Sequence, residues 1–367
     1  MKMNKWTMGL AAAGVVTLSS VAQAQDAAAG AEALAASTTL SGYVSTGYKY
    51  ANSASTGYFR AGENRNSFSL DVVDLKLSSA QGDGAMDTGY TVELWMGPGA
   101  SDIGTSDNAT GNTNGEDTVA LMQANVDLRI ADIDLKIGQF GTVVGAETYD
   151  YTSNTFYTHS WGFAVEPTHH TGLLASYTVS DDLQVSAGLA NTTTAETNGA
   201  GTGSGSSKTL LGSVSYTLPS GTGALAGTAL YYGIVSGNGT GTSGDNDDYH
   251  YASVTLPELA ANLSISVAWD HVESGTTGTA DSNVVGLYVG YQVNDDLALN
   301  ARYEMGNINT ISSGWASNAD GIESITIGAN YKIWDNVISR IEFRNDDKDG
   351  TGTTSQRTVA ANLIYSF

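Results

Sequence analysis

Histidine, serine and acidic residues gather between residues 139 and 170 of the chain. His159 and Ser160 place an imidazole beside a hydroxyl, but no acid lies at a spacing that would complete a catalytic triad. His159, His169 and His170 are of a type that binds metals, yet adjacent histidines on a strand point to opposite faces. We therefore expect ordinary polar contacts here, with no catalytic residue, no metal and no cofactor.

Two other segments carry partial ligand motifs. Residues 345–350 begin like a calcium-binding loop, but position twelve of that loop is Gln356, where calcium loops carry Glu. The glycines at Gly201, Gly203 and Gly205 lack the strand-to-helix context of a nucleotide site. The absence of cysteine excludes disulfides, thiol catalysis and cysteine-bound metals. A solvated acidic loop and a flexible loop are expected, and the chain is not predicted to be an enzyme.

Composition narrows the class of protein further. Acidic residues outnumber basic ones by 38 to 15 and the net charge is −23, so no basic surface exists to neutralise nucleic acid. Charged residues are only 14% of the chain and glycines number 44, which is unusual for a soluble globular protein. However, 41% hydrophobic residues and 19 tyrosines are too many for a disordered chain.

The N-terminus has the pattern of a secretory signal. Lys2 and Lys5 precede the apolar stretch 6–18, and Ala22-Gln23-Ala24 forms a cleavage site. The alternative, a membrane anchor, would need a longer apolar stretch. The sequence therefore predicts a signal peptide over 1–24, an Ala-rich periplasmic lead-in over 25–38 and one domain over 39–367.

The elements that must position the polar residues follow a period of two. Apolar and polar residues alternate most clearly over 120–130, 297–305, 325–333 and 359–367, each about the ten residues of a strand that crosses a bilayer at a tilt. A slip of the apolar phase between Val72 and Val73 predicts a β-bulge. Such segments begin near Leu40, Ser67, Gly89, Ala120, Ile133, Gly172, Leu183, Leu210, Ala224, Tyr249, Leu263, Val284, Leu297, Ile322, Val337 and Thr358.

Short and long connections alternate between these strands. Short turns lie at 131–132, 180–181, 294–295 and 334–335. The long loops cover 51–66, 97–118, 139–170, 191–208, 236–247, 306–320 and 345–356. A membrane barrel has this asymmetry, because one rim faces the periplasm and the other faces outward. We therefore predict an all-β fold, a transmembrane antiparallel β-barrel of about 16 strands with short periplasmic turns and long extracellular loops.

Tyrosines recur where strands reach the short-turn rim. An aromatic girdle at the headgroups of the outer-membrane lipid has this arrangement, and a soluble hairpin repeat would not need it. The residues are Tyr177, Tyr216, Tyr291, Tyr331 and Tyr365.

Polar residues on the opposite face of the strands are predicted to line a wet pore, because charges that face lipid cost several kcal/mol each. The predicted pore wall comprises Lys49, Asp127, Arg129, Asp134, Lys136, Arg302, Glu304, Lys332, Arg340, Glu342 and Arg344. The loop 139–170 is rich in apolar residues, which predicts that it packs inside the barrel. The predicted constriction residues of this loop are Glu147, Asp150, Tyr151, Tyr157, His159, His169 and His170.

Several motifs resemble a known family. Leu363, Tyr365 and Phe367 end the chain in alternation, as in Gram-negative outer-membrane porins, where this ending resembles the signal read by the barrel-assembly machinery. The segment 138–172 is similar to OmpL-like β-barrel porins. It contains Gly138-Gln139-Phe140, Gly145-Ala146-Glu147, Asn154, Tyr157-Thr158-His159-Ser160 and Pro167-Thr168-His169-His170-Thr171-Gly172. The resemblance implies that the third external loop narrows the pore and that the protein forms a homotrimer.

The sequence thus predicts an integral protein of the bacterial outer membrane, a porin through which small hydrophilic solutes and ions diffuse passively. Glu147 and Asp150 would give a mild cation preference, which Arg129, Arg302 and neighbouring arginines would oppose. One alternative is a substrate-selective channel in which Tyr151 and neighbouring aromatic residues guide a sugar. The others are a surface protease or phospholipase, and a structural or adhesive barrel.

Overall fold

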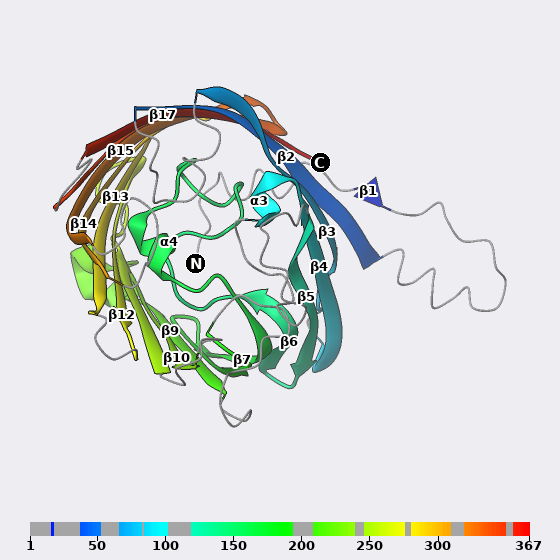
Figure 1. The fold of residues 1–367 in the computed structure, drawn as a ribbon. Coiled ribbons are helices and arrows are strands. Elements are labelled where there is room, and N and C mark those ends of the chain that lie inside the picture. The colour runs from blue at the N-terminus through cyan, green and yellow to red at the C-terminus, as the bar shows by residue number, and fades with distance from the viewer. Residues whose placement is uncertain are drawn as a thin grey trace.

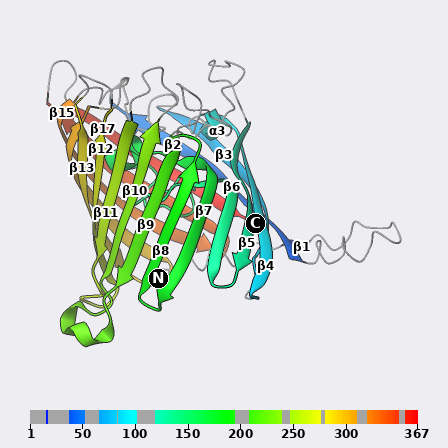
Figure 2. The same cartoon turned by 90° about the horizontal axis from the view of Figure 1, so that it is seen from below.

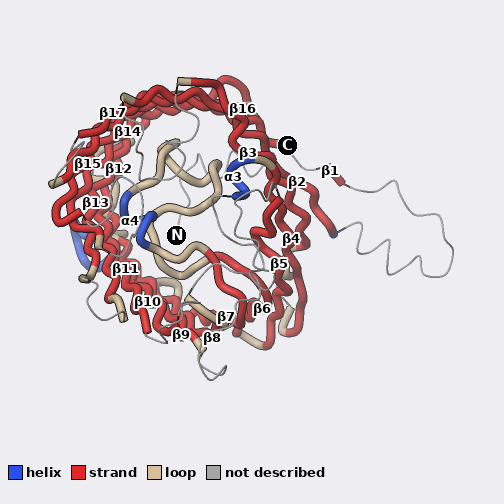
Figure 3. Tube along the Cα trace, in the orientation of Figure 1, coloured by secondary structure: helices blue, strands red, loops and turns tan. Residues whose placement is uncertain are grey.

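The computed structural model describes residues 16–17, 37–52, 66–82, 84–101, 119–193, 208–238, 246–275, 280–309, 319–349 and 355–367. Within them, sixteen antiparallel strands form a closed barrel, which confirms the predicted fold class. Figure 1 shows the strands as a ring seen along its axis, and Figure 3 shows how little of that ring is not strand. The strands are β2 (Thr38–Ala51), β3 (Ser67–Ser79), β4 (Met86–Met96), β5 (Val119–Ile130), β6 (Ile133–Gly141), β7 (His169–Ser180), β8 (Leu183–Ala190), β9 (Thr209–Thr217), β10 (Ala229–Asn238), β11 (Asn246–Thr255), β12 (Leu263–Glu273), β13 (Ser282–Gln292), β14 (Leu297–Ile308), β15 (Ala319–Trp334), β16 (Val337–Lys348) and β17 (Ser355–Ser366).

Each strand pairs with its neighbours in sequence, and the ring closes where β17 pairs with β2. A two-residue strand, β1 (Val16–Thr17), lies within the predicted signal peptide and pairs with Leu40 and Thr39 of β2. Two short helices, α3 (Pro98–Ser101) and α4 (Trp161–Val165), and the 3-10 helix η2 (Ser220–Leu225) complete the described elements. Among these residues no helix has both the length and the apolar character needed to cross a membrane.

Alternation of side chains explains why these segments are strands of a membrane barrel. On β14, Leu299 and Met305 are exposed on the outer face, whereas Arg302 and Glu304 are buried on the inner face. This is the reverse of a soluble protein, because the outer face meets hydrocarbon. The predicted aromatic rim is also confirmed: Tyr177, Tyr216, Tyr291, Tyr331 and Tyr365 are all exposed, near the short-turn ends of their strands.

Two bulges modify this alternation. The bulge predicted at Val72 is present, displaced by one residue: Ser45 pairs with Val72 and Thr46 with Leu70, so Asp71 is the extra residue. A second bulge in β5 was not predicted. Met122 has no partner on β4, and the strand changes face there, so that Met122 is 0% exposed and Val126 49%.

The periplasmic rim predicted from sequence differs at one place. The strand expected to begin near Ala224 begins at Ala229, because η2 occupies the preceding residues. Figure 2 shows η2 projecting beyond the rim. Pro219 starts this helix and cannot donate to a strand ladder, which explains the longer turn.

At the opposite rim, parts of six predicted long loops lie outside the described residues, namely 53–65, 102–118, 194–207, 239–245, 310–318 and 350–354. The predicted cleavage site at Ala22 to Ala24 and most of the lead-in 25–38 also lie outside them.

Candidate pore constriction

The connection between β6 and β7 lies inside the ring of strands, and Figure 1 shows it in green across the middle of the barrel. We call residues 142–168 the inner loop. The sequence boundaries of 139 and 170 were too wide, because Gln139 belongs to β6, and His169 and His170 belong to β7.

Local hydrogen bonds give the inner loop a defined shape. Asn154 holds two parts of it together: Oδ1 accepts from the Thr148 amide at 2.9 Å, and Nδ2 donates to the Thr148 carbonyl at 2.5 Å. Ser160 caps α4, because its hydroxyl accepts a hydrogen bond from the Phe163 amide at 3.0 Å. Gly145 has a φ of 107°, a left-handed conformation that favours glycine. The loop is therefore an ordered element.

Apolar residues of the inner loop pack on three parts of the wall. Near its start, Val143 and Val144 pack with residues of β6 and β8–β12. In its middle, three tyrosines pack against Tyr43 of β2 and Trp95 of β4, and in α4, Trp161 and Val165 pack against β12–β15. The tyrosines are Tyr149, Tyr151 and Tyr157.

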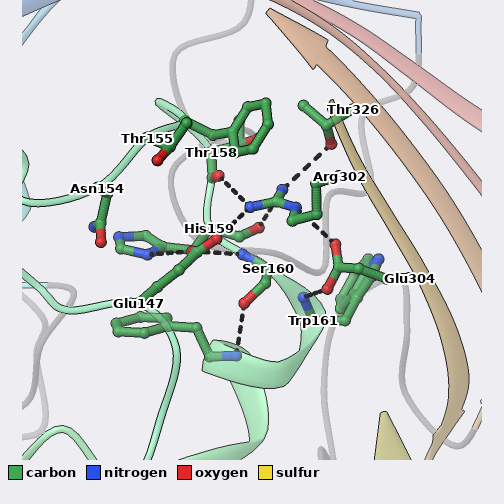
Figure 4. Close-up of polar contacts among 12 residues, drawn as sticks. Glu147, Asn154, Thr155, Thr158, His159, Ser160, Trp161, Arg302, Glu304 and Thr326 are labelled. Atoms are coloured by element: carbon green, nitrogen blue, oxygen red, sulfur yellow. Dashed lines mark hydrogen bonds and ion pairs between the residues drawn. The ribbon is translucent and has the colours of Figure 1, made fainter. Parts of the chain in front are cut away.

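The polar centre of the site is an ion pair between Glu147 of the inner loop and Arg302 of β14 (Figure 4). Glu147 Oε1 and Arg302 Nη1 are 2.5 Å apart, while Glu147 Oε2 accepts from the Ser160 amide at 2.9 Å and contacts His159 Nδ1 at 3.2 Å. Burial alone would raise the pKa of Glu147, but the Arg302 guanidinium and His159 lower it to about 2. Glu147 is therefore ionised and neutralised by its partner at neutral pH.

Glu304 and β16 extend this network. Glu304 accepts from the Trp161 amide at 2.5 Å, and the carboxylate of Glu342 accepts from the amides of Tyr157 and Thr158. Arg340 donates to two loop carbonyls, those of Tyr151 and Phe156. Backbone groups of the inner loop thus find charged partners on the wall, which satisfies polar groups that the loop would otherwise bury unpaired.

Arg344 and Asp346 of β16 hold the start of α4. Their side chains form an ion pair of 2.8 Å, Arg344 donates to the His159 carbonyl, and Trp161 Nε1 donates to Asp346 at 2.9 Å. The Arg344 guanidinium also lies over the Trp161 ring, 5.2 Å from its centroid. The role of Asp346 was missed in the sequence, where it was assigned to a solvated loop.

These contacts correct the prediction for the basic residues. Arg302, Arg340 and Arg344 do face inward as expected, but they are only 1%, 3% and 0% exposed because the inner loop covers them. Lys49, Glu304 and Glu342 are buried in the same way. These six residues were expected to line a wet pore, and instead they lie in the interface between loop and wall.

A different part of the inner face is in contact with water. On β3–β6, Lys76 pairs with Glu93 at 3.5 Å, Lys136 with Asp127 at 3.0 Å and Arg129 with Asp134 at 2.7 Å. The side chains of Lys76 and Lys136 are 37% and 36% exposed. We call this group the charged wall. Asp127, Arg129, Asp134 and Lys136 were predicted for the pore wall, whereas Lys76 and Glu93 were missed. The bulge at Asp71 shifts the phase of β3 and so accounts for Lys76.

The remaining predicted residues fall into separate places. Asp150 is half-buried and accepts hydrogen bonds from the Thr152 amide and hydroxyl, both at 2.8 Å. His170 contacts the Thr142 hydroxyl at 3.0 Å, and the His169 ring packs at a tilt against Tyr149, both where the loop meets the wall. Lys332 lies at the short-turn rim and pairs with Asp335 at 2.9 Å.

The histidines do not meet at one point. In the part of the chain that the structure describes, no cluster of three or more His, Cys, Asp or Glu residues could hold a metal ion. Ser160 caps a helix and His159 bonds to Glu147, so their side chains have structural partners.

Sixteen antiparallel strands, a closed ring and an inward third loop define a porin-like β-barrel of the outer-membrane channel class. The family model described as "Putative beta-barrel porin-2, OmpL-like" matches residues 37–367, and the chain belongs to this family. Porins are typically channels without enzymatic activity. No curated protein matches the chain.

Solved structures share this fold at low sequence identity. The anion-selective porin from Comamonas acidovorans is 14% identical, with 90% of this chain and 99% of that chain covered and a TM-score of 0.61. A loop-deletion mutant of OmpT from Vibrio cholerae is 15% identical, with coverage of 90% and 99% and a TM-score of 0.61. The outer membrane channel DcaP of Acinetobacter baumannii is 11% identical, with coverage of 90% and 97% and a TM-score of 0.58.

Proposed function

We propose that the chain forms a water-filled channel for passive diffusion of small hydrophilic solutes and ions across the outer membrane. One observation carries this proposal: the inner face is divided into a covered half and a wet half. Inward residues toward the long-loop ends of the strands, such as Trp95, Arg302 and Arg344, are buried beneath the inner loop. Toward the short-turn ends of β5–β8, Arg129, Lys136 and Ser176 contact solvent. Water therefore reaches the inner face beside the charged wall.

The solvated part of the inner face carries polar side chains. Ser176 of β7 and Ser186 of β8 lie opposite each other, with their hydroxyls 2.9 Å apart, and Ser213 of β9 lies opposite Ser186 on its other side. Hydroxyls on this side and paired charges on the charged wall offer hydrogen bonds to a hydrated solute without one dominant charge. We expect weak charge selectivity, because each wall cation has an acidic partner within 3.5 Å.

Steady single-channel conductance in a planar bilayer tests this function. Purified barrel should give discrete, ohmic steps, and Lys76→Gln with Lys136→Gln should move the reversal potential in a salt gradient toward cation preference. Lys332→Gln is the matched control, because Lys332 lies at the rim and should alter selectivity less. Absence of conductance from correctly folded barrel would overturn the proposal.

The alternatives receive less support from the geometry. A sugar-guiding track would need accessible aromatic residues, but Tyr151 and Tyr157 are buried among other tyrosines. A surface hydrolase would need a nucleophile free to react, and the Ser160 hydroxyl serves as a helix cap. Liposome swelling with neutral sugars of increasing size would distinguish general diffusion, which falls smoothly with size, from a saturable, selective channel.

We also propose export by the signal peptide 1–24, insertion in the outer membrane by the barrel-assembly machinery and assembly as a homotrimer. The apolar outer face and the tyrosine rim support a location in lipid. One solved relative, in-vitro folded OmpT from Vibrio cholerae, is described in a trimer form. Mass measurement of the native protein in detergent tests the trimer.

A further inference from the structure

Two acidic side chains meet where the inner loop returns to the wall. Glu166 directly follows α4 and is its C-cap residue, while Asp270 points inward from β12. Their carboxyl groups are hydrogen-bonded to each other. Because an ionised carboxylate can only accept hydrogen bonds, this contact requires a proton on one of the two groups.

The surroundings of the pair are closely packed. A Cβ atom on Gly162 would overlap Asp270 Oδ2, and one on Gly145 would overlap Glu166 Oε2. The remaining oxygens, Glu166 Oε1 and Asp270 Oδ1, are buried without a hydrogen-bond partner in the described structure. A second negative charge would therefore find neither water nor a donor there.

The charges around the pair oppose ionisation. Glu147 from the inner loop and Glu304 from β14 face it, and both of their carboxylates already engage Arg302. Tyr251 of β11 is a further titratable neighbour. Burial, together with the Asp270 carboxyl, raises the pKa of Glu166 well above its ordinary range.

We propose that Glu166 and Asp270 share one proton and so form a latch that holds α4 against β12 and β13, and that loss of this proton at alkaline pH releases α4 from the wall. The α4 segment contacts both strands. Release exposes Glu166 to water, which solvates the negative charge that its carboxylate gains. The Glu147–Arg302 pair lies at the N-terminal end of α4, where Glu147 bonds to the Ser160 amide, and it stays ionised, so the release is local.

The dependence on pH follows from the count of protons. The latched state holds a proton that a released Glu166 would give up near its ordinary pKa of 4.5. The latch is therefore complete below that pH. As pH rises from there to the raised pKa, the ratio of latched to released molecules falls about tenfold per pH unit.

Cysteine labelling measures the release directly, because the natural chain has no cysteine. Ala164→Cys places a thiol on α4, where the side chain packs against a buried cluster, and Thr155→Cys places one at an exposed position of the same loop. The rate at which a small thiol reagent labels Ala164→Cys is divided by the rate for Thr155→Cys. This ratio removes the effect of pH on thiol chemistry. We expect this ratio to rise with pH between 6 and 10, by up to about tenfold per unit.

Two variants assign the effect to the pair. In Glu166→Gln, the amide can donate to the ionised Asp270 at every pH, so the ratio should stay low and flat. Glu273→Gln, an exposed acid on the same strand, should leave the pH dependence unchanged. The latch would be overturned if the labelling ratio did not change with pH in the cysteine variants that keep Glu166. It would also be overturned if the pH dependence persisted after Glu166→Gln. If added calcium changed the ratio at constant pH, the pair would be a cation site, and this result would also overturn the latch.

Labelling requires no channel activity, so it is independent of the proposed function. The effect on conductance rests on that function: current noise should increase over the same pH range as labelling. Labelling that responds to pH in a barrel without conductance would support the latch and reject the channel. A conducting barrel whose labelling does not respond to pH would reject the latch alone.

Discussion

Glu147 illustrates how a charge inside a barrel can serve structure. Its carboxylate accepts from a guanidinium and a backbone amide and also contacts an imidazole, so little of its field reaches the pore. The depression of its pKa to about 2 corresponds to roughly 3 kcal/mol of loop anchoring. The sequence prediction gave it a role in selectivity, and the geometry favours a role in holding the loop.

Glu147→Gln should therefore loosen the inner loop. The substitution leaves Arg302 buried with a weaker partner, and breaking a buried pair costs about 3–5 kcal/mol. We expect a lower melting temperature and noisier single-channel currents. Asp150→Asn is the matched control, because Asp150 bonds only within the loop tip and should change both quantities less. Equal effects of the two variants would contradict the anchoring role.

Acid should reproduce this effect in the natural protein. Glu147 has a pKa below its ordinary value of 4.5, so its stabilisation is complete above pH 4.5 and is lost as pH falls toward 2. Conductance noise should be constant between pH 6 and 5 and increase below 4.5. Glu147→Gln should show no such increase, and a transition at the same pH in that variant would place the titrating group elsewhere.

At the scale of elements, the alternation of apolar and polar residues predicts the strands and the short turns. Each strand has one face toward lipid and one toward the barrel interior, and this environment requires the alternation. It does not reveal β5's bulge, since Ala120 and Met122 are apolar and fit either face. Nor does it separate a wet inward charge from a covered one: Arg129 and Arg302 occupy equivalent alternating positions. Only the path of the inner loop distinguishes them, and that path depends on contacts across the whole chain.

Removal of the inner loop tests its part in the passage. Deleting Val144 to Ser160 removes the Glu147 pair and the tyrosines that pack in the middle of the barrel. We expect a several-fold larger conductance, because the covered half of the inner face becomes wet. Deletion within η2 is the control, since that helix projects from the rim. An unchanged conductance would place the loop outside the path of ions.

The alternation of long and short connections predicts which rim of the barrel faces the cell exterior. Epitope tags at Asn198 or Gly239, which lie outside the described residues, or at Asp349 should be accessible to antibody on intact cells. Tags in the turns at Asp181 or Asp295 should be accessible only after the outer membrane is permeabilised, because short turns face the periplasm. Surface labelling at Asp295 would reverse the assigned orientation.

At the scale of the molecule, backbone hydrogen bonds join the first strand of the barrel, β2, to the end of the chain after β17. The Gly42 amide donates to the Phe367 carbonyl at 3.0 Å, and the Phe367 amide donates to the Gly42 carbonyl at 2.9 Å. Leu363 and Tyr365 pair with β2 just before this point and face outward. The last residue therefore completes the seam in addition to its proposed role as an assembly signal.

Deletion of Phe367 should lower the amount of folded, heat-modifiable barrel in outer membranes several-fold. The deletion removes both hydrogen bonds to Gly42 and the aromatic end group. Phe367→Trp keeps the backbone bonds and the aromatic character and should assemble normally. Normal folded levels of the deletion variant would contradict both roles.

The inner loop also has a consequence for the order in which the barrel forms. Tyr157 bonds through its amide to Glu342, 185 residues further along the chain, and through its hydroxyl to Asp71, 86 residues before it. Contacts of such long range are slow to form, because each must close a large segment of chain. The inner loop contacts strands near both ends of the ring, β3 through Asp71 and β16 through Glu342. It can act as an internal template, so variants that weaken its anchors should slow refolding in detergent more than they accelerate unfolding.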